Sequence, residues 1–403
     1  MNKRCDIAIV GGGLNGLTTA LALAQAGFDV VVVERADPAK QREDSFDGRV
    51  SSIAYSSKLV LDALGAWEAM TAHAEPILEI RVSDGDAPLF LHYDHADLGD
   101  EPLGWILENR YIRRALDAAL ATTPGVRVLA PAEVAGMTRD SDGVTLTMTD
   151  GAALDAKLAV ACDGAMSPLR AIARIGHFYH AYGQSGIVCN VRHERRHRGI
   201  AHERFLPSGP FAILPVPGNM ASLVWTEKDD IARRVVELDR VDILEEINWR
   251  FGDFLGDLEL AGPVWSYPLR LVLADRYTDS RLALLGDAAH AIHPIAGQGY
   301  NLGIRDVAVL AEVLADGRKL GLEPGDASLL ERYARWRRTD MMTLVSVCDS
   351  LNCLFSNAIP PVVLARDLGL AAVNQIPPLK RLLMRHAMGT VGKLPRLMRG
   401  EEL

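Results

Sequence analysis

Residues 6–16 of the chain read Asp6-Ile7-Ala8-Ile9-Val10-Gly11-Gly12-Gly13-Leu14-Asn15-Gly16. The mainly apolar segment 6–10 predicts a short strand that enters a glycine-rich turn, and the apolar spacing over 14–25 predicts a helix. A valine-rich run at 28–34 predicts a second strand, and Gly27 stands before it, where a helix C-cap glycine is expected. The stretch therefore predicts a strand–helix–strand unit at the start of the chain.

The spacing of the glycines in this turn indicates a dinucleotide-binding site. Gly11 allows the tight turn, Gly13 lets the backbone approach a pyrophosphate, and Gly16 lets the helix pack closely on its strand. The N-terminus of the helix then faces the phosphates. Glu34, at the end of the second strand, is placed to accept hydrogen bonds from ribose hydroxyls. This pattern alone leaves open whether the nucleotide is FAD or NAD.

A second motif favours FAD. The apolar run 282–285 predicts a buried strand, and Gly286-Asp287-Ala288-Ala289-His290 follows it directly. Asp287 is placed to bind a polyol such as the ribityl chain of a flavin. A helix predicted over 299–314 would direct its positive N-terminal end at the N1–C2=O edge of the flavin ring. An ordinary turn is the alternative, which the run of glycines and small residues after Asp287 disfavours.

A third motif lies between these two. It reads Ala161-Cys162-Asp163-Gly164-Ala165 and is followed by Ser167 and Arg170. Asp-Gly is a common turn, so this motif indicates a cofactor site only together with the other two.

The three motifs together resemble those of the flavin monooxygenases related to para-hydroxybenzoate hydroxylase. Within that group the chain resembles the FAD-dependent hydroxylases of ubiquinone biosynthesis almost from end to end. The specific parts are residues 286–306 and the tail Leu394-Pro395-Arg396-Leu397. Shorter shared segments lie at 47–49, 108–110, 182–184 and 205–210.

The resemblance implies an FAD site and a set of residues that form it. The cofactor-binding residues it implies are Gly11, Gly13, Gly16, Glu34, Arg35, Arg49, Arg110, Asp163, Asp287, Pro294, Gly297, Gly299 and Asn301. His290 and Pro294 are the candidates near the flavin ring, and neither is assigned a firm catalytic role. A role for His290 in relaying a proton is a hypothesis beside a simpler packing role.

The resemblance also implies a reaction. Reduced flavin reacts with O2 to give a C4a-hydroperoxide, whose distal oxygen is transferred to an electron-rich phenol, while the protein excludes water and orients the ring. Only one dinucleotide fingerprint is present, so electrons come from NAD(P)H that docks transiently or from an electron-transfer protein. The implied substrate is a polyprenyl phenol of ubiquinone biosynthesis. The alternatives are a small soluble aromatic acid, held in a polar pocket by an arginine, and a non-catalytic flavin-bearing scaffold.

We expect an α/β fold in which a Rossmann-like FAD-binding domain is interrupted by a mixed β-sheet substrate domain and followed by a helical C-terminal region. The expected FAD-binding domain is discontinuous and comprises residues 1–75, 101–175 and 276–340. The expected substrate domain comprises 76–100 and 176–275, and the helical region is 341–403.

The bulk composition excludes several classes of function. The net charge of −9 argues against a nucleic-acid partner. The five cysteines form no CxxC pair and are expected to be idle thiols in a reducing compartment. His290 and His293 lack further ligands at suitable spacing, so no metal is expected. No signal peptide or membrane span is apparent, and a cytoplasmic protein is expected.

The C-terminal region is rich in Leu, Met and Val between residues 341 and 364. A helical layer that covers the FAD domain is the simpler interpretation. The alternatives are the mouth of a tunnel for a prenylated substrate, a peripheral contact with the inner face of a membrane, or a surface for partner enzymes of the same pathway. A basic rim suits an anionic lipid surface and a solvated face almost equally, and comprises Arg381, Arg385, Lys393, Arg396 and Arg399.

Overall fold

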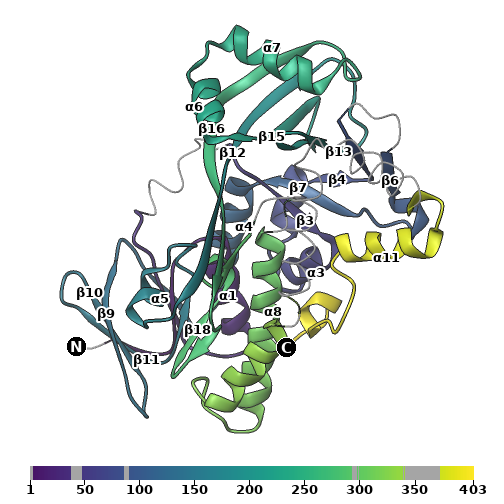
Figure 1. Ribbon diagram of the computed structural model, residues 1–403. Coiled ribbons are helices and arrows are strands. Elements are labelled where there is room, and N and C mark those ends of the chain that lie inside the picture. The colour runs from purple at the N-terminus through teal and green to yellow at the C-terminus, as the bar shows by residue number, and fades with distance from the viewer. Residues whose placement is uncertain are drawn as a thin grey trace.

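The structure is a computed structural model of the 403-residue chain, shown in Figure 1. It describes residues 3–37, 48–85, 90–292, 297, 299–338, 340 and 373–403. A lower unit contains the N-terminal strand–helix–strand segment, and an upper unit contains a large curved sheet capped by α6 (Asp229–Glu237) and α7 (Arg240–Phe251) (Figure 1).

The lower unit is built on a parallel sheet. The predicted opening segment is confirmed as β1 (Lys3–Val10), α1 (Leu14–Gln25) and β2 (Val30–Val33). The strands run in the order β17-β18-β11-β1-β2-β8, and the five from β18 to β8 are parallel. The bounds of the remaining strands of this path are Val126–Leu129 for β8, Ala153–Ala161 for β11, Thr278–Asp279 for β17 and Leu282–Leu284 for β18.

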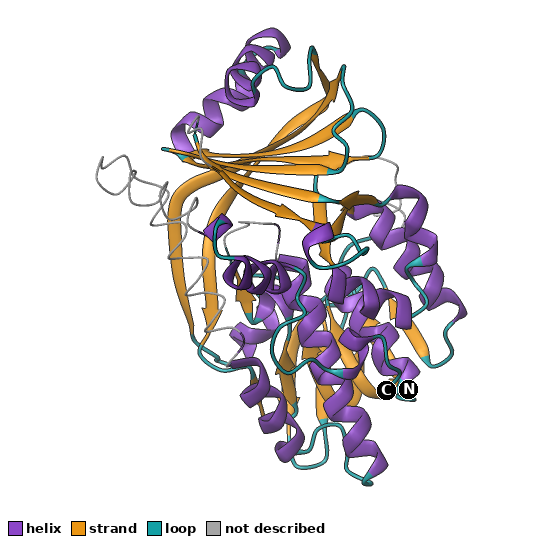
Figure 2. Ribbon diagram, turned by 90° about the vertical axis from the view of Figure 1, so that its right-hand side faces the viewer, coloured by secondary structure: helices purple, strands orange, loops and turns teal. Residues whose placement is uncertain are grey.

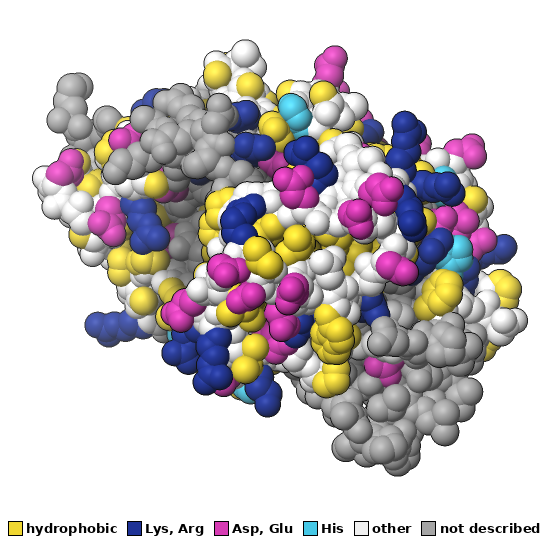
Figure 3. Space-filling model, turned by 90° about the horizontal axis from the view of Figure 1, so that it is seen from above, with side chains coloured by type: hydrophobic (Ala, Val, Ile, Leu, Met, Phe, Trp, Pro, Cys, Tyr) yellow, Lys and Arg dark blue, Asp and Glu magenta, His cyan; other side chains and the backbone are white. Residues whose placement is uncertain are grey.

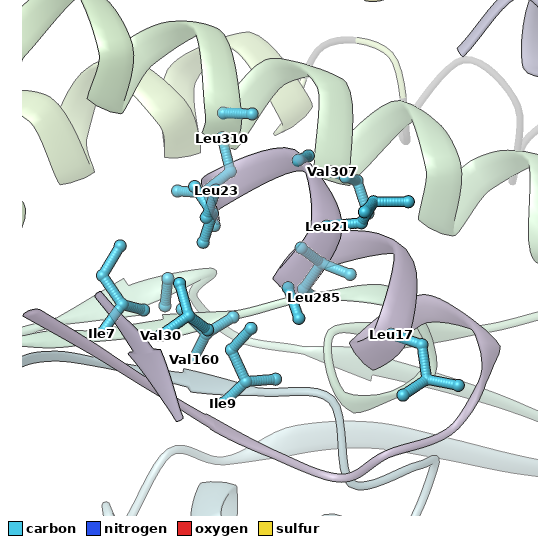
Figure 4. Close-up of a cluster of buried hydrophobic side chains, with 14 of the residues drawn as sticks. Ile7, Ile9, Leu17, Leu21, Leu23, Val30, Val160, Leu285, Val307 and Leu310 are labelled. Atoms are coloured by element: carbon cyan, nitrogen blue, oxygen red, sulfur yellow. The ribbon is translucent and has the colours of Figure 1, made fainter. Parts of the chain in front are cut away.

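An antiparallel extension, β9 (Val134–Arg139) and β10 (Val144–Met148), is attached to β11. The helix α1 packs against α4 (Asn109–Thr122) and α8 (Gly299–Lys319). Their apolar faces and the strands form one continuous core, part of which is drawn in Figure 4. Because all strands in the middle of this sheet are covered, β2 reads as an uninterrupted run of valines.

The upper sheet has eight strands in the order β19-β16-β12-β15-β14-β13-β5-β6. Its strands are β5 (Glu79–Asp84), β6 (Phe90–Asp94), β12 (His177–His193), β13 (Ile200–Leu206), β14 (Gly209–Val216), β15 (Met220–Lys228), β16 (Leu258–Ala274) and β19 (His290–Ala291). Acidic and basic side chains are interspersed on the side of the molecule that carries α6 and α7 (Figure 3).

Two long strands connect the two units. β12 and β16 pair from His177 with Ala274 to His193 with Leu258, with irregularities at two points. They curve from the upper sheet down beside the lower unit (Figure 2). The apolar run 187–191 predicts a strand that covers only part of β12, and no local pattern predicts β16.

A small third sheet lies between these two layers. It consists of β3 (Val50–Ala54), β7 (Gly104–Glu108) and β4 (Glu75–Ile77). The apolar pattern of residues 54–69 predicts one helix, but this prediction is too long, because α3 (Tyr55–Ala63) ends before Gly65. Gly65 has a φ of +73°, which a continuing helix does not allow. Four short helices complete the description up to residue 292, namely η1 (Glu68–His73), η2 (His95–Asp97), α5 (Pro168–Ile172) and η3 (Gly286–Ala288).

The C-terminal part is helical where the structure describes it. Residues 327–338 form a helix, and α11 (Pro377–Ala387) and η5 (Arg396–Arg399) follow. The apolar stretch 341–364, for which the sequence left several roles open, lies outside the described residues. Among the helices that are described, none combines the length and the hydropathy needed to cross a bilayer.

Candidate cofactor site and the facing sheet

The glycines of the first motif differ in what surrounds them. A Cβ on Gly11, whose φ is +102°, would lie 2.3 Å from the carbonyl oxygen of Cys162, and one on Gly16 would lie 1.9 Å from the carbonyl oxygen of Gly11. A Cβ on Gly13 would meet no atom within 4 Å. Gly11 and Gly16 are therefore required by the protein's own packing, whereas the space beside Gly13 is open. Gly13 is also the N-cap of α1 and supplies no side-chain cap.

Beside this loop lies a pocket of about 430 Å³ whose lining includes Gly12, Glu34, Arg113 and Val128. The Gly12 N–H donates to Glu34 at 2.5 Å, and the Arg113 guanidinium donates to the Gly12 carbonyl at 2.8 and 3.0 Å. Each carboxylate oxygen has two lone pairs, so Glu34 can still accept from a ribose. Arg35 is exposed next to it. Sequence reasoning did not identify Arg113, which stands in an ordinary amphipathic helix without any motif.

The second motif packs directly on the first. A Cβ on Gly286 or on Gly303 would come within 2.4 Å of the Asn15 side chain. The Asn15 Oδ1 atom is buried and has no hydrogen-bond partner among the described residues. Sequence reasoning passed over Asn15; its signal was an amide within a glycine turn, next to the predicted flavin motif.

Asp287 stands on this second motif. Its side chain is exposed, although its neighbours Gly286 and Ala288 are buried. Burial in the surrounding protein nevertheless raises the pKa of Asp287, while the charges of His290 and Arg49 oppose that rise. An accessible carboxylate in a low-polarity recess is suited to accept hydrogen bonds from a bound polyol.

The third motif, which contains Asp163, contacts the second motif. The Asp163 Oδ2 atom accepts the Leu169 N–H at 2.9 Å, but its Oδ1 atom is buried without a partner in the described part of the chain. Burial raises the pKa of Asp163. Arg170 donates to the Ala288 carbonyl at 2.8 Å and so connects this motif to the second one.

His290 is buried and bonded to another side chain. Its Nε2 atom lies 2.6 Å from Asp306 Oδ2, and its Nδ1 atom has no partner among the described residues. Asp306 also accepts the Gly286 N–H at 2.8 Å and a hydrogen bond from Nε of Arg337. Burial would raise the pKa of Asp306, but the charges of His290 and Arg337 together hold it below its ordinary value.

The two arginines implied by the resemblance lie near each other. Arg49 precedes β3, and its carbonyl accepts the Asn109 N–H at 3.1 Å. Arg110 follows at the start of α4 and bonds to Glu108 at 2.5 Å. The Arg49 guanidinium lies 5.9 Å from the ring centre of Tyr267 on β16.

The remaining implied residues lie at the start of α8. Gly297 has a φ of +61° and approaches Ser52, and Gly299 begins the helix with open space beside it. The Asn301 amide binds β3, donating to the Ser52 carbonyl at 2.8 Å and accepting the Ala54 N–H at 2.9 Å. Pro294 and His293 lie outside the described residues.

Two sets of residues elsewhere bear on the expectations about metals and thiols. Ligand atoms of Glu79, His92 and Asp94 lie within 4.8 Å of one another, but Glu79 already bonds to Arg81 at 2.8 Å and to His92 at 3.0 Å. Cys5, Cys162 and Cys189 are free thiols, and burial raises the pKa of each. Cys348 and Cys353 lie outside the described residues.

The upper sheet turns one face toward the helices α6 and α7 and the other toward the small sheet. Ile213 and Trp225 pack in the cluster that includes Phe251 of α7. Leu214, which follows Ile213 on β14, and Ala201 on β13 pack instead with residues of β4, β7 and α11. Alternation along the strands then assigns the regularly paired positions of the sheet to one face or the other.

The second of these faces, which we call the inner face, is mainly apolar. One continuous row across it, from β6 to β16, comprises Leu91, Val82, Glu203, Ala212, Val224, Val188 and Trp265. Positions flanking this row on the same face are Tyr93, Ile80, Ala201, Leu214, Ser222, Asn190, Asp84, Phe205, Thr226, Gly186 and Tyr267. None of these positions carries Arg or Lys.

The inner face meets the cofactor motifs at its β16 end. A Cβ on Gly48 would lie 2.2 Å from the Trp265 ring, and Arg49 lies over Tyr267. β19, which begins at His290, pairs with β16. The sheet is therefore joined to the loop that carries Asp287.

The residues at this junction fit FAD. The open space at Gly13, the pocket beside Glu34, and the unpartnered buried oxygen of Asp163 are suited to a dinucleotide. The accessible Asp287 lies where the lower unit meets the inner face.

Comparisons with known proteins agree with this geometry. The FAD binding domain family matches residues 4–347. Ubiquinone hydroxylase UbiL of Rhodospirillum rubrum is 50% identical over 406 residues, covering 100% of this chain and 94% of the relative. The 3-demethoxyubiquinol 3-hydroxylase of Escherichia coli is 36% identical, covering 96% of this chain and 99% of the relative.

The fold is also found in solved structures. The p-nitrophenol 4-monooxygenase PnpA of Pseudomonas putida superimposes with a TM-score of 0.82 at 22% identity, covering 98% of this chain and 100% of that chain. At this identity the match supports the fold, and the full-length relatives support the family. The chain therefore belongs to the FAD binding domain family and, within it, to the FAD-dependent hydroxylases related to the ubiquinone hydroxylases.

Proposed function

We propose that the protein is an FAD-dependent monooxygenase that hydroxylates the aromatic ring of a prenylated phenol during ubiquinone biosynthesis. The observation that carries this proposal is the identity of 50% to a ubiquinone hydroxylase over the whole chain. A relationship of this extent includes both the cofactor motifs and the sheet that faces them.

In this reaction one atom of O2 enters a ring C–H bond as a hydroxyl group and the other leaves as water. Two electrons come from NAD(P)H or an electron-transfer protein, and two protons complete the balance. The FAD supplies the activation of O2. The chain's own residues bind the cofactor, orient the ring and exclude water. For these tasks we propose the implied cofactor residues, with Glu34 at the ribose, Asp163 and Asp287 along the cofactor, and Gly299 at the helix end that faces the ring.

The inner face supports a prenylated phenol over a small aromatic acid. Recognition of a carboxylate would call for an arginine or lysine, and the named positions of the inner face contain neither. Its aliphatic and aromatic side chains are suited to an isoprenoid chain instead.

The first experiment is the quinone-lipid profile, by mass spectrometry, of cells in which the gene is deleted. We expect an under-hydroxylated prenyl phenol to accumulate, and its substitution pattern to identify the ring carbon. Re-expression of the wild-type chain should restore ubiquinone, whereas Gly13→Ala should not. Normal ubiquinone in the deletion strain, without a second gene able to replace this one, would contradict the proposal.

We further propose that α11 rests on an anionic bilayer, from which a prenylated substrate would enter. Its Leu379 and Leu382 and the preceding Ile376 are exposed, as are Arg381 and Arg385. Phe90, also exposed, lies beside them, because its carbonyl accepts a hydrogen bond from Asn374 at 2.6 Å. Apolar side chains next to arginines are the composition of a helix that lies on an anionic membrane surface.

This proposal is tested by flotation with vesicles of phosphatidylcholine, with and without phosphatidylglycerol. We expect the wild type to float only with anionic vesicles, and Leu379→Gln with Leu382→Gln to abolish flotation. Leu320→Gln is the matched control, because Leu320 is 77% exposed at the end of α8, away from α11. Equal flotation of the α11 variant and the control would refute the role of α11.

A further inference from the structure

We propose that Glu203 on β13 accepts the hydrogen bond of the substrate's phenolic hydroxyl and takes up its proton when the ring is oxidised. The proposal rests on the proposed function and adds the residue that recognises the phenol. It arises from the position of this carboxyl on the inner face.

Glu203 is the one ionisable member of its row across the sheet. Its neighbours on the adjacent strands are Val82 and Ala212, and the row continues through Val224 and Val188. His202 and Arg204 flank Glu203 in sequence but lie on the opposite face. His202 contacts the Phe254 ring, and Arg204 donates to carbonyls at the end of α7.

The carboxyl of Glu203 makes no hydrogen bond or ion pair within the described part of the chain. Burial raises the pKa of Glu203 to about 7. The side chain is nevertheless half-buried rather than sealed. A half-buried carboxyl without a partner among the described residues can be reached by a ligand, and carboxyls of this kind cluster at functional sites.

The charged and ionisable groups that the structure describes around Glu203 do not pair with its carboxyl. On the inner face, Asp84 lies on the neighbouring strand beside Phe205, and burial raises the pKa of Tyr93 to about 12, which keeps its hydroxyl neutral.

The small sheet packs against β14. Its acids Glu75 and Glu108 are directed elsewhere, the first toward His197 at 3.9 Å and the second to Arg110. From α11, Met384 and Met388 pack into this layer.

The position of Glu203 relative to the cofactor motifs suits this role. Four strand spacings, about 19 Å, separate β13 from β16, where the face meets Arg49 and the Asp287 loop. We infer that a flavin ring held by those motifs and a substrate ring beside it would lie within this span. The carboxyl thus meets the far, hydroxyl-bearing edge of a substrate ring whose reacting carbon is turned toward the cofactor.

The step is a proton transfer. As the ring carbon gains its bond to oxygen, the phenol oxygen becomes a carbonyl oxygen, and its O–H bond breaks with the proton passing to the Glu203 carboxylate. When the ring carbon loses its hydrogen and aromaticity returns, a proton is delivered back to that oxygen. A base is most effective when its pKa is near the working pH.

The test uses the FAD-loaded enzyme with 2-geranylphenol as the probe. Binding, followed by the flavin absorbance, should tighten as the pH rises through about 7 in the wild type, because the carboxylate form accepts the phenol proton. In Glu203→Gln the affinity should not depend on pH. Its kcat should fall by about 100-fold or more, with KM changed far less. Glu203→Asp should recover part of the rate together with the pH dependence.

Two controls separate this result from damage to the fold. Because the raised pKa of Glu203 means that its ionised form destabilises the folded state, Glu203→Gln should melt no lower than the wild type at pH 8. Glu245→Gln, which alters an exposed carboxylate of α7, should behave as the wild type.

Binding that does not respond to pH in the wild type, or that responds equally in Glu203→Gln, would overturn the proposal. If the wild type binds the phenol with the expected pH dependence but does not hydroxylate any prenyl phenol, the proposed function fails and the recognition of phenols by Glu203 stands.

Discussion

His290 and Asp306 form a buried pair, with Nε2 of the histidine 2.6 Å from Oδ2 of the carboxylate. Asp306 also receives the Gly286 N–H and Nε of Arg337, which lies on the helix 327–338. One carboxylate on α8 therefore fixes both ends of the loop 286–290, on which Asp287 stands. We infer that this network holds the loop in the shape that a flavin requires.

Asp306→Asn should destabilise the protein and weaken its hold on FAD. The change leaves the Arg337 guanidinium, itself fully buried, with the half-buried Asp340 as its one remaining carboxylate partner among the described residues. Breaking a buried ion pair in this way costs about 3–5 kcal/mol. Thermal unfolding and FAD release, followed by flavin fluorescence, measure the two effects. Arg335→Gln is a suitable control, because its pair with Glu331 is exposed; equal stability of the two variants would contradict the inference.

The same carboxylate should shape the response of stability to acid. Because the folded pKa of Asp306 lies below its ordinary value, the carboxylate stabilises the protein at pH values above about 4. That stabilisation is lost as the pH falls through the folded pKa. We expect the melting temperature of the wild type to fall more steeply below about pH 5 than that of Asp306→Asn. Parallel curves would show that Asp306 is not ionised in the folded protein.

His290→Asn separates the two roles considered for this histidine. With Nε2 bonded to Asp306, a positioning role predicts weaker FAD binding but an unchanged ratio of product formed to O2 consumed. A proton relay predicts instead that this ratio falls while FAD stays bound. We expect the first result, and simultaneous measurement of O2 uptake and product distinguishes them.

The sequence predicted the lower unit well because its elements are short and locally determined. The strand and helix of residues 3–25 follow from apolar periodicity and glycine spacing alone. The inner face could not be predicted in this way. Glu203 joins a row whose members come from β6 to β16, and only long-range strand pairing shows that they share a face.

The cofactor residues beside the glycine turns were partly predictable, because they too belong to short local motifs. Glu34 and Asp287 stand next to recognisable turns, so their positions could be inferred. Arg113 bonds to a residue 101 positions away in the sequence. Asp306 bonds to side chains 16 and 31 positions away. Such partners become apparent only when the helices are packed. The expected domain bounds stay a prediction, since β12 and β16 run through both layers.

Gly13→Ala and Gly11→Ala form a matched pair that separates cofactor binding from folding. A methyl group on Gly13 meets no protein atom within 4 Å, so the apoprotein should fold with an almost unchanged melting temperature. Its FAD affinity should fall strongly, because the methyl group would occupy the space reserved for the pyrophosphate. Gly11→Ala should instead fail to fold stably, since its Cβ would lie 2.3 Å from a backbone oxygen at a φ of +102°. A Gly13→Ala protein that retains FAD would place the phosphates elsewhere.

Asp287→Asn tests whether this carboxylate holds the cofactor. Hydrogen bonds to a charged group contribute about 1.5–3 kcal/mol each, so replacing the charged acceptor should weaken FAD binding by roughly 10- to 100-fold. Burial raises the pKa of Asp287 in the protein without FAD. Protonation must then compete with cofactor binding, and FAD affinity of the wild type should fall as the pH is lowered toward that raised pKa. The Asn variant has no proton to gain and should lose this dependence. Titration of the apoprotein with FAD at several pH values measures both effects, and a wild-type affinity that stays constant from neutral to mildly acid pH would show that Asp287 does not contact the cofactor as a carboxylate.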